Sequence, residues 1–275
     1  MSAAPPLAGV IGWPIGHSRS PRLHGHWLRR YRIDGHYIPI ALSPEAFEAG
    51  LRALLQLGFR GVNVTIPHKE AALALATTTT ERARAIGAAN TLTFGPDGSI
   101  HADNTDGYGF VANLRQHVPG WDPAAGPALV LGAGGAARGI VAALLAEGAP
   151  ELRLANRTGE RAESLAAHFG PRVRVVAWEE ALAGAGDATM VVNTTSLGMA
   201  GEPELPFRFD AGGSYLVTDL VYGAEPTPFV RAARQRGLPA IDGIGMLLHQ
   251  AVPGFEAWFG RRPEVDAELL AAVLA

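Results

Sequence analysis

The sequence predicts an α/β protein of two domains, one of which is a doubly wound, Rossmann-type sheet. The length of 275 residues suggests about two domains. Residues 128–242 alternate short apolar runs with helical segments, as parallel strands with crossover helices do. The apolar run Ala128–Leu131 also leads directly into the pattern G-x-G-x-x-A at residues 132–137, between a predicted strand and a predicted helix.

The predicted strands of this second domain, residues 108–242, end in turns or polar residues. They are expected at Ala128–Leu131, Glu151–Ala155, Val173–Val176, Met190–Asn193, Tyr215–Asp219 and Ala240–Asp242. Helices are expected between most of them, including Thr158–Phe169 and Pro228–Arg236. The order of elements predicts a parallel sheet with helices on both faces.

The first domain, residues 1–107, also alternates strands and helices, with different loops. Strands are expected at Leu7–Gly12, Tyr37–Ala41, Gly61–Thr65, Asn90–Phe94 and Ser99–Ala102, the last two forming a hairpin around the turn signal at residues 95–98. Helices are expected at Pro21–Tyr31 and Pro44–Leu57, the latter with Ser43 as its N-cap. The apolar segment from Gly245 to Phe259 predicts one more helix.

The bulk composition is typical of a cytoplasmic enzyme. A net charge of −3 and a pI near 6.3 argue against a nucleic-acid or membrane-surface role. The absence of cysteine excludes disulfides, thiolate catalysis and Cys-ligated zinc. The N-terminus lacks a signal-peptide pattern, and no run of 18 uncharged apolar residues is present. We therefore expect no membrane partner and no nucleic-acid partner.

The glycine-rich turn predicts a dinucleotide site. Gly132 permits the tight turn, Gly134 lets a pyrophosphate approach the backbone, and Ala137 keeps the helix close to the strand. The helix N-terminus, with Ala133, Gly135 and Ala136 around it, offers free N–H groups to phosphates. The alternative is a glycine-rich turn with no ligand.

The end of the second strand selects the cofactor. An NAD site places an acidic residue there to hold the ribose 2′-hydroxyl. This chain has Asn156, Arg157 and Thr158 instead, followed by Arg161. Two guanidinium groups and a hydroxyl attract a 2′-phosphate, which an acid would repel, so the residues predict NADP. The alternative is that these arginines are merely solvated at a helix start.

Polar residues in the first domain indicate a second site. Ser18 and Ser20 flank a helix start, where hydroxyls and free N–H groups hold a carboxylate, although Ser20 could also simply cap the helix. Asn63 and Thr65 share one face of a predicted strand and suit a ligand with several hydroxyls. Lys69 opens the next helix, where a cation is electrostatically disfavoured; the alternative is a solvent-facing lysine.

The cluster Asp103-Asn104-Thr105-Asp106-Gly107 follows the hairpin, next to the nucleotide domain. These residues could serve turn chemistry alone. Their position beside the cleft expected between the two domains favours a functional role.

Six separated motifs resemble the shikimate dehydrogenase family, in the family's order. They are Ser18-Arg19-Ser20, the N-V-T-x-P-x-K run 63–69, Asn90-Thr91-Leu92, the D-N-T-D-G run 103–107, the turn 132–136 and Asn156-Arg157-Thr158. Two later pieces also fit, Asp219-Leu220-Val221-Tyr222 and residues 243–250. The resemblance covers nearly the whole chain and implies NADP-dependent reduction of 3-dehydroshikimate to shikimate, a step of chorismate and aromatic amino acid biosynthesis.

The resemblance implies a role for each matching residue. Ser18 and Ser20 would hold the substrate carboxylate, with Tyr222 closing on that end. The ring hydroxyls would be held by Asn63, Thr65, Asn90, Asp106 and Gln250. Leu220 and Gly243 would touch the nicotinamide, and Lys69 and Asp106 would form the catalytic pair. Residues 243–275 would return to the first domain.

Hydride addition to a carbonyl needs an acid within hydrogen-bond reach of the oxygen. The nine histidines show no metal-binding pattern, so no metal is expected. Lys69 is the predicted acid, oriented by Asp106; the opposite assignment, with Asp106 transferring the proton, stays open. The sequence also leaves open whether the chain is a monomer or a homodimer.

Two differences from the family pattern stand out. Gly25 replaces the usual Asn after His24, and Thr194 replaces an Ala in the run 193–198. Two rival functions remain: a quinate/shikimate dehydrogenase using NAD or NADP, and a non-catalytic NADP(H)-binding regulatory protein. Ser20 and the Asn-Arg-Thr sequence disfavour the first. The presence of Lys69 and Asp106 disfavours the second, since a sensor would need neither.

Overall fold

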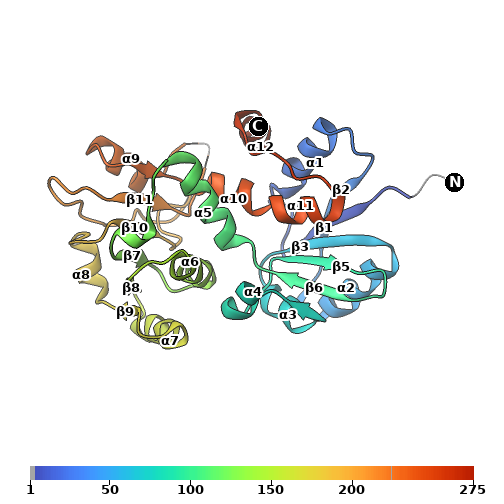
Figure 1. The fold of residues 1–275 in the computed structure, drawn as a ribbon, viewed down its shortest axis with the longest axis horizontal. Coiled ribbons are helices and arrows are strands. Elements are labelled where there is room, and N and C mark those ends of the chain that lie inside the picture. The colour runs from blue at the N-terminus through green and yellow to red at the C-terminus, as the bar shows by residue number, and fades with distance from the viewer. Residues whose placement is uncertain (1–3, 224) are drawn as a thin grey trace. The chain divides into compact units, whose positions relative to one another are not determined.

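The computed structural model describes residues 4–223 and 225–275. The chain divides into two units (Figure 1). Unit 1 holds the residues up to Thr105 together with Leu248–Ala275, and unit 2 holds Asp106–Leu247. The junctions predicted from the sequence, after residues 107 and 242, lie a few residues from these: a helix begins at Asp106, at the first junction, and the helix Ile244–Gln250 runs across the second.

Unit 1 contains a mixed six-stranded sheet in the order β2-β1-β3-β5-β6-β4. The strands are β1 (Leu7–Gly12), β2 (His36–Ala41), β3 (Phe59–Val64), β4 (Thr78–Thr79), β5 (Thr91–Phe94) and β6 (Ile100–Asp103). β1 pairs in parallel with β2 and β3, whereas β5 pairs antiparallel with β3 and β6. The predicted hairpin is confirmed as β5–β6, and Gly98 takes the positive φ of 81° that its turn requires.

Helices cover both faces of this sheet (Figure 1). They are α1 (Ser20–Arg30), η1 (Pro44–Ala46), α2 (Phe47–Gln56), α3 (Lys69–Ala74), α4 (Glu81–Ile86), α11 (Val252–Phe259) and α12 (Ala267–Leu274). Val62 and Val64 of β3 join the apolar cluster that contains Phe47 and Leu51 of α2. Gly61 faces the other way, and a Cβ there would lie 2.0 Å from the indole nitrogen of Trp258 on α11.

Unit 2 contains a parallel six-stranded sheet in the order β12-β11-β10-β7-β8-β9. The strands are β7 (Ala128–Leu131), β8 (Leu152–Ala155), β9 (Val173–Val175), β10 (Met190–Asn193), β11 (Leu216–Asp219) and β12 (Ala240–Ile241). This is the doubly wound order in which two halves diverge between β7 and β10. The predicted fold class is confirmed.

Two apolar clusters, one on each face, hold unit 2 together. The helices are α5 (Asp106–His117), η2 (Pro123–Ala125), α6 (Gly135–Ala146), α7 (Gly159–Phe169), α8 (Trp178–Leu182), α9 (Pro228–Gln235) and the first part of α10 (Ile244–Gln250), whose residues from Leu248 on belong to unit 1. Val130 and Val192 pack with side chains of α5, α6 and α7. Leu131 and Val191 pack with side chains of α8 and α9. Alternate residues of each strand thus serve opposite faces, as the pleat dictates.

Several local predictions were wrong in detail. The helix expected at Pro44–Leu57 starts as the 3₁₀ turn η1 before α2, and the Ser43 hydroxyl bonds the Glu45 side chain instead of capping the backbone. The helix expected after Gly245 is two helices, because Pro253 in the first turn of α11 cannot continue α10. Strand β3 ends at Val64, one residue before Thr65.

The predicted set also omitted α4, α5, α8, α12 and β4. All are short or carry weak apolar periodicity. Among the described residues, no helix has the length and apolar character needed to cross a membrane.

Candidate active site

The serine pair lies at the start of α1. The Ser18 hydroxyl accepts a hydrogen bond from the Ser20 backbone N–H at 3.3 Å, and Ser20 is the first residue of the helix. Ser20 is buried, and the N-cap position belongs to Arg19, with no side-chain cap. The alternative in which Ser20 simply caps the helix is therefore wrong, and its hydroxyl remains inside unit 1 beside Tyr37.

Tyr37 of β2 connects this serine to the next site residue. Its hydroxyl donates to Asn63 Oδ1 at 2.7 Å. Burial raises the pKa of Tyr37, and a hydrogen bond with Ser20 opposes that rise. The His24 ring stacks on Tyr37 at 3.9 Å between centroids, and burial lowers the pKa of His24 to about 3, so this supporting ring is neutral.

The side-chain amide of Asn63 is hydrogen-bonded to other groups of the protein. Its Nδ2 donates to the Asn90 carbonyl and to Thr91 Oγ1, both at 3.2 Å, while Oδ1 accepts from Tyr37. The side chain is 5% exposed. Only Oδ1 can still accept a further hydrogen bond from a ligand. In this structure the main role of Asn63 is therefore to connect β2 with the start of β5.

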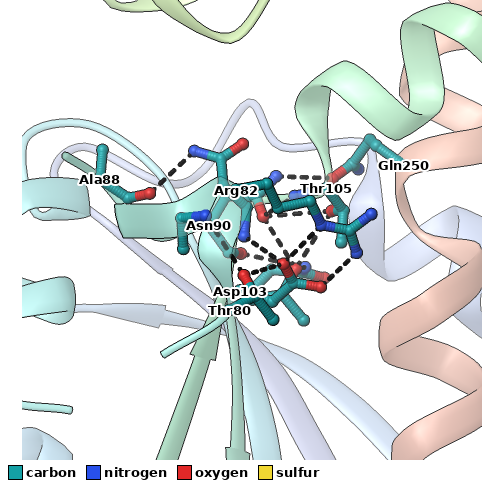
Figure 2. Close-up of polar contacts among 11 residues, drawn as sticks. Thr80, Arg82, Ala88, Asn90, Asp103, Thr105 and Gln250 are labelled. Atoms are coloured by element: carbon teal, nitrogen blue, oxygen red, sulfur yellow. Dashed lines mark hydrogen bonds and ion pairs between the residues drawn. The ribbon is translucent and has the colours of Figure 1, made fainter. Parts of the chain in front are cut away.

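Asn90 is the centre of the polar network (Figure 2). Its Oδ1 accepts from the Thr105 backbone N–H at 2.9 Å, from the Thr105 hydroxyl at 3.1 Å and from the Thr91 hydroxyl at 2.9 Å. Its Nδ2 donates to Gln250 Oε1 at 3.3 Å. Two predicted site residues that are 160 positions apart in the sequence therefore touch.

A second set of bonds fixes the loop that follows β6. Asp103 Oδ1 accepts from Thr80 Oγ1 and from Arg82 Nε, each at 2.7 Å, and Arg82 also pairs with Oδ2 (Figure 2). Burial by itself would raise the pKa of Asp103, but the bonds from Arg82 and Thr80 outweigh it and hold that pKa below its usual value. Asn104 Nδ2 donates to the Ala88 carbonyl at 2.9 Å. These bonds hold the D-N-T-D-G run as a defined turn.

Lys69 is the first residue of α3, as predicted. The preceding His68 is buried, stacks on Phe47 and bonds the Leu42 carbonyl at 2.8 Å, so it anchors the turn in the core. The Lys69 carbonyl accepts from Ala89 N–H at 2.8 Å, which ties the start of α3 to the residue before Asn90. The lysine side chain is only partly exposed.

Lys69 is the only lysine in the chain, beside 22 arginines. A guanidinium stays protonated at any physiological pH, whereas an ammonium gives up its proton. The one basic position that keeps an amine is thus the one predicted to transfer a proton. This compositional signal was available in the sequence.

Asp106 and Tyr222 lie in unit 2, outside the unit that carries the other predicted substrate residues. Asp106 is the first residue of α5 and Tyr222 is 37% exposed. Gly107 follows Asp106 because a Cβ there would lie 2.8 Å from the Cβ of Ala143 on α6. Thr65, in unit 1, is partly exposed just past β3 and donates its backbone N–H to the Ile11 carbonyl.

The glycine turn after β7 fits a phosphate. Gly132 has φ of 108°, and a Cβ there would lie 2.5 Å from Thr194 Oγ1, so glycine is required. Cβ atoms on Gly134 and Gly135 would meet nothing within 4 Å. Ala133 through Ala136 are partly or fully exposed, while Ala137 is buried in the core. Backbone N–H groups at the start of α6 therefore face open space.

Asn156 holds the turn to the end of β8. Its Oδ1 accepts from Ala133 N–H at 3.1 Å, and its Nδ2 donates to the Thr158 carbonyl at 2.8 Å. Thr158 precedes α7 without capping it. Arg157 and Arg161 are exposed, and neither forms an ion pair with any described residue. Two exposed arginines, one just past β8 and one in the first turn of α7, suit a 2′-phosphate.

Leu220 and Gly243 lie against each other just past the ends of β11 and β12. A Cβ on Gly243 would lie 2.0 Å from the Leu220 carbonyl oxygen, and Gly243 N–H donates to the Val221 carbonyl at 3.3 Å. The two residues predicted to touch the nicotinamide are thus in direct backbone contact. Residues 132–137, 156–158, 220 and 243 fit a dinucleotide. Within residues 4–223 and 225–275, no cluster of His, Asp and Glu side chains could hold a metal ion.

Three family models match the chain. They are described as the shikimate dehydrogenase substrate binding domain (residues 10–92), shikimate / quinate 5-dehydrogenase (120–198) and the shikimate 5′-dehydrogenase C-terminal domain (243–267). A shikimate dehydrogenase (NADP(+)) of Paracoccus denitrificans is 61% identical over 98% of this chain and 96% of its own length. One of Dinoroseobacter shibae is 58% identical over 98% of both.

The chain belongs to the shikimate dehydrogenase family.

Solved structures of this fold include enzymes with other substrates. Shikimate 5-dehydrogenase of Thermus thermophilus in complex with NADP(H) and shikimate matches with TM-score 0.85 and 36% identity, over 98% of both chains. Quinate dehydrogenase of Corynebacterium glutamicum in complex with NAD matches with TM-score 0.88 and 30% identity, over 98% of this chain and 99% of that one. The predicted family is confirmed, while the residue roles stay predictions.

Sequence reasoning missed two residues that organise the site, Tyr37 and Asp219. Each is a buried polar residue in a strand. A tyrosine in a strand and an aspartate at a strand end are common, and nothing local marks their partners. The signal for Asp219 was its place within a family motif next to Leu220.

Proposed function

We propose that this chain catalyses the reversible, NADP-dependent reduction of 3-dehydroshikimate to shikimate, in chorismate and aromatic amino acid biosynthesis. The observation that carries the proposal is the buried network centred on Asn90, which orders amide and hydroxyl groups around the segment that presents Lys69. Such a network suits a ligand with several hydroxyls, because the protein groups are already fixed before the ligand arrives.

The serine pair holds the substrate carboxylate at the start of α1. The hydroxyls of Ser18 and Ser20 and the free N–H groups of that helix end supply donors. Ring hydroxyls are held by Thr65, Asn90, Asp106 and Gln250, with Asn63 fixing the others in place through its bonds to β2 and β5. Tyr222 closes on the carboxylate end.

Unit 2 holds the cofactor. The N–H groups after Gly134 bind the pyrophosphate, and Arg157 and Arg161 bind the 2′-phosphate with Thr158, while Asn156 keeps their loop against the turn. Leu220 and Gly243 contact the nicotinamide. NADPH, when bound, supplies the hydride for the substrate carbonyl.

Lys69 supplies the proton that the carbonyl oxygen needs as it becomes a hydroxyl, and it takes that proton back in the reverse direction. Asp106 orients the ammonium through a charge-assisted hydrogen bond and accepts a hydrogen bond from a substrate hydroxyl. The reverse assignment, in which Asp106 transfers the proton, is distinguished by the Lys69 variants described below.

A small-molecule substrate is the only ligand besides NADP in this proposal. We place the enzyme in the cytoplasm, without a nucleic-acid or membrane partner, as a monomer or homodimer. The compartment and the lack of nucleic-acid and membrane partners rest on the near-neutral charge and the absence of cysteine.

One assay tests the function. The purified chain is given shikimate or quinate with NADP⁺ or NAD⁺, and absorbance of the reduced nicotinamide is followed. We expect the highest kcat/KM for shikimate with NADP⁺. A preference for quinate with NAD⁺ would establish the quinate/shikimate alternative, and absence of turnover with all four pairs would favour the regulatory protein.

A further inference from the structure

Asp219 is a buried carboxylate at the last position of β11. It is 0% exposed, and three donors converge on it. Oδ1 accepts from Asn193 Nδ2 at 2.9 Å and from Val221 N–H at 3.0 Å, and Oδ2 accepts from the Thr227 hydroxyl at 2.7 Å. All of these contacts lie within unit 2.

Each donor belongs to a different structural element. Asn193 ends the neighbouring strand β10, and its Oδ1 accepts from both the backbone N–H and the hydroxyl of Thr195. Thr227 is the N-cap of α9 and accepts from Val230 N–H at 3.3 Å. Val221 belongs to the segment that leaves β11. One carboxylate therefore fixes two strand ends and one helix start.

The segment fixed in this way is the one proposed to meet the nicotinamide. Leu220 lies between Asp219 and Val221, and its N–H donates to the Asn193 carbonyl at 2.9 Å. Gly243 packs on the Leu220 backbone and bonds the Val221 carbonyl. A shift of Val221 away from Asp219 would therefore move both Leu220 and Gly243.

A carboxylate is chemically suited to this place. It accepts at both oxygens, whereas an amide would put an N–H donor in place of the oxygen that now accepts from the Thr227 hydroxyl. The ion has no cationic partner among the described residues, since all three donors are neutral. A buried charge held by neutral donors alone is costly, which argues that its position serves more than stability.

We propose that Asp219 is a positioning residue for the nicotinamide half of the cofactor, acting through Val221, Asn193 and Thr227 on the segment Leu220–Gly223 and on Gly243. The inference rests on the proposed function. It predicts that Asp219 controls turnover and nicotinamide binding while leaving the adenosine 2′-phosphate site unchanged.

The test compares Asp219→Ala and Asp219→Asn with a matched variant, Asp210→Ala. The Asp210 side chain also accepts a backbone hydrogen bond in unit 2, from Ala185 at 2.7 Å, but forms no hydrogen bond with Asn193, Val221 or Thr227. Two quantities are measured: kcat and KM for NADP⁺ with shikimate, and the Kd for adenosine 2′,5′-bisphosphate. That probe carries the 2′-phosphate and no nicotinamide.

We expect Asp219→Ala to lower kcat/KM for NADP⁺ about tenfold or more, because it leaves three buried donors without an acceptor. Asp219→Asn retains two of the three bonds and should lower it by roughly twofold to tenfold. The Kd for the bisphosphate should change by less than about twofold in both variants, as the 2′-phosphate contacts are separate. Asp210→Ala should retain the wild-type kcat/KM.

Three results would overturn the inference: wild-type kcat/KM in Asp219→Asn, equal loss of bisphosphate and NADP⁺ binding, or the same kinetic loss in Asp210→Ala. If Asp219→Ala does not fold, Asp219→Asn alone decides by the same criteria. Failure of the proposed function is distinguishable, because the wild-type chain would then show no turnover of shikimate with NADP⁺.

Discussion

The two units differ in the kind of group that forms their part of the candidate site. In unit 1 the groups are buried side chains bonded to one another, with Tyr37, Asn63 and Asn90 in one connected network. In unit 2 the turn at Gly134 offers backbone N–H groups to open space, flanked by the exposed Arg157. Changes in unit 1 should therefore spread through shared partners, whereas changes at the exposed cofactor contacts should act one at a time.

One aspartate in each unit shows a second difference, in the direction of its pKa shift. Asp103 of unit 1 faces the Arg82 guanidinium, and its pKa is held below its usual value despite burial. Asp219 of unit 2 faces only neutral donors, and burial raises its pKa to about 6, with Asp242 adding to the rise. Burial alone therefore does not decide the direction in which the pKa of an acid shifts, because a neighbouring cation can reverse it.

The largest expected effect is at Lys69. Lys69→Ala and Lys69→Arg should each lower kcat by about 10²–10⁴-fold, because neither side chain gives up a proton as the amine does. The adenosine 2′,5′-bisphosphate Kd, measured alongside, should stay at the wild-type value, since that contact lies in unit 2. Retention of more than about a tenth of wild-type kcat in Lys69→Arg would assign proton transfer to another group, of which Asp106 is the first candidate.

The next effect concerns stability and pH. Because the folded pKa of Asp219 is raised, its contribution to the free energy of unfolding is present below the unfolded value of 3.8 and is lost as pH rises through about 6. The stability of Asp219→Asn relative to wild type should therefore rise between about pH 4 and pH 7, by up to about 3 kcal/mol over that range.

Urea unfolding of both proteins across this range measures the difference. The charge of Asp242 adds to the rise in the pKa of Asp219, as the smallest of its causes, so Asp242→Asn serves as the control and should flatten the wild-type profile only slightly. A difference that stays constant with pH would show that Asp219 titrates normally.

Cofactor choice comes third. Arg157→Ala should lower kcat/KM for NADP⁺ roughly tenfold to a hundredfold, the loss of one charge-assisted hydrogen bond, while NAD⁺ changes little. Arg161→Ala should behave alike. Arg174→Ala, another exposed arginine of unit 2, provides the control. Equal losses for NADP⁺ and NAD⁺ would contradict the assignment of the end of β8 to the 2′-phosphate.

The smallest effect lies in the turn of unit 1. Arg82 is 42% exposed on its side chain, so Arg82→Ala should lower the free energy of unfolding by only about 0.5–1 kcal/mol at neutral pH. The folded pKa of Asp103 is lowered, so this contribution is present above the unfolded value and is lost as pH falls through the folded one.

The unfolding free energies of wild type and Arg82→Ala should accordingly converge in acid. Arg84→Ala is the matched control, because Arg84 lies on the same helix and bonds the Thr79 hydroxyl instead of a carboxylate. A gap between wild type and Arg82→Ala that persists in acid would mean that the ion pair is not its source.

Most elements could be predicted because their signals are local. The strand before Gly132, the hairpin turn at residues 95–98 and the Lys69 helix start all depend on residues that are neighbours in sequence. The errors have local causes too: Pro253 splits one predicted helix, and a hydroxyl expected to cap the backbone bonds Glu45. Helices such as α8, with five residues, have too few turns for their periodicity to show.

The sequence by itself determined the family, the doubly wound unit, the choice of NADP and the candidate proton donor, because each rests on a short run of residues whose chemistry is independent of distant partners. Only the tertiary structure decided how these residues are held. Asn90 meets Gln250 across 160 positions, and Asp219 meets Asn193 across 26. Such contacts depend on which strands are neighbours and on the register between them, and no periodicity in one segment specifies its partner.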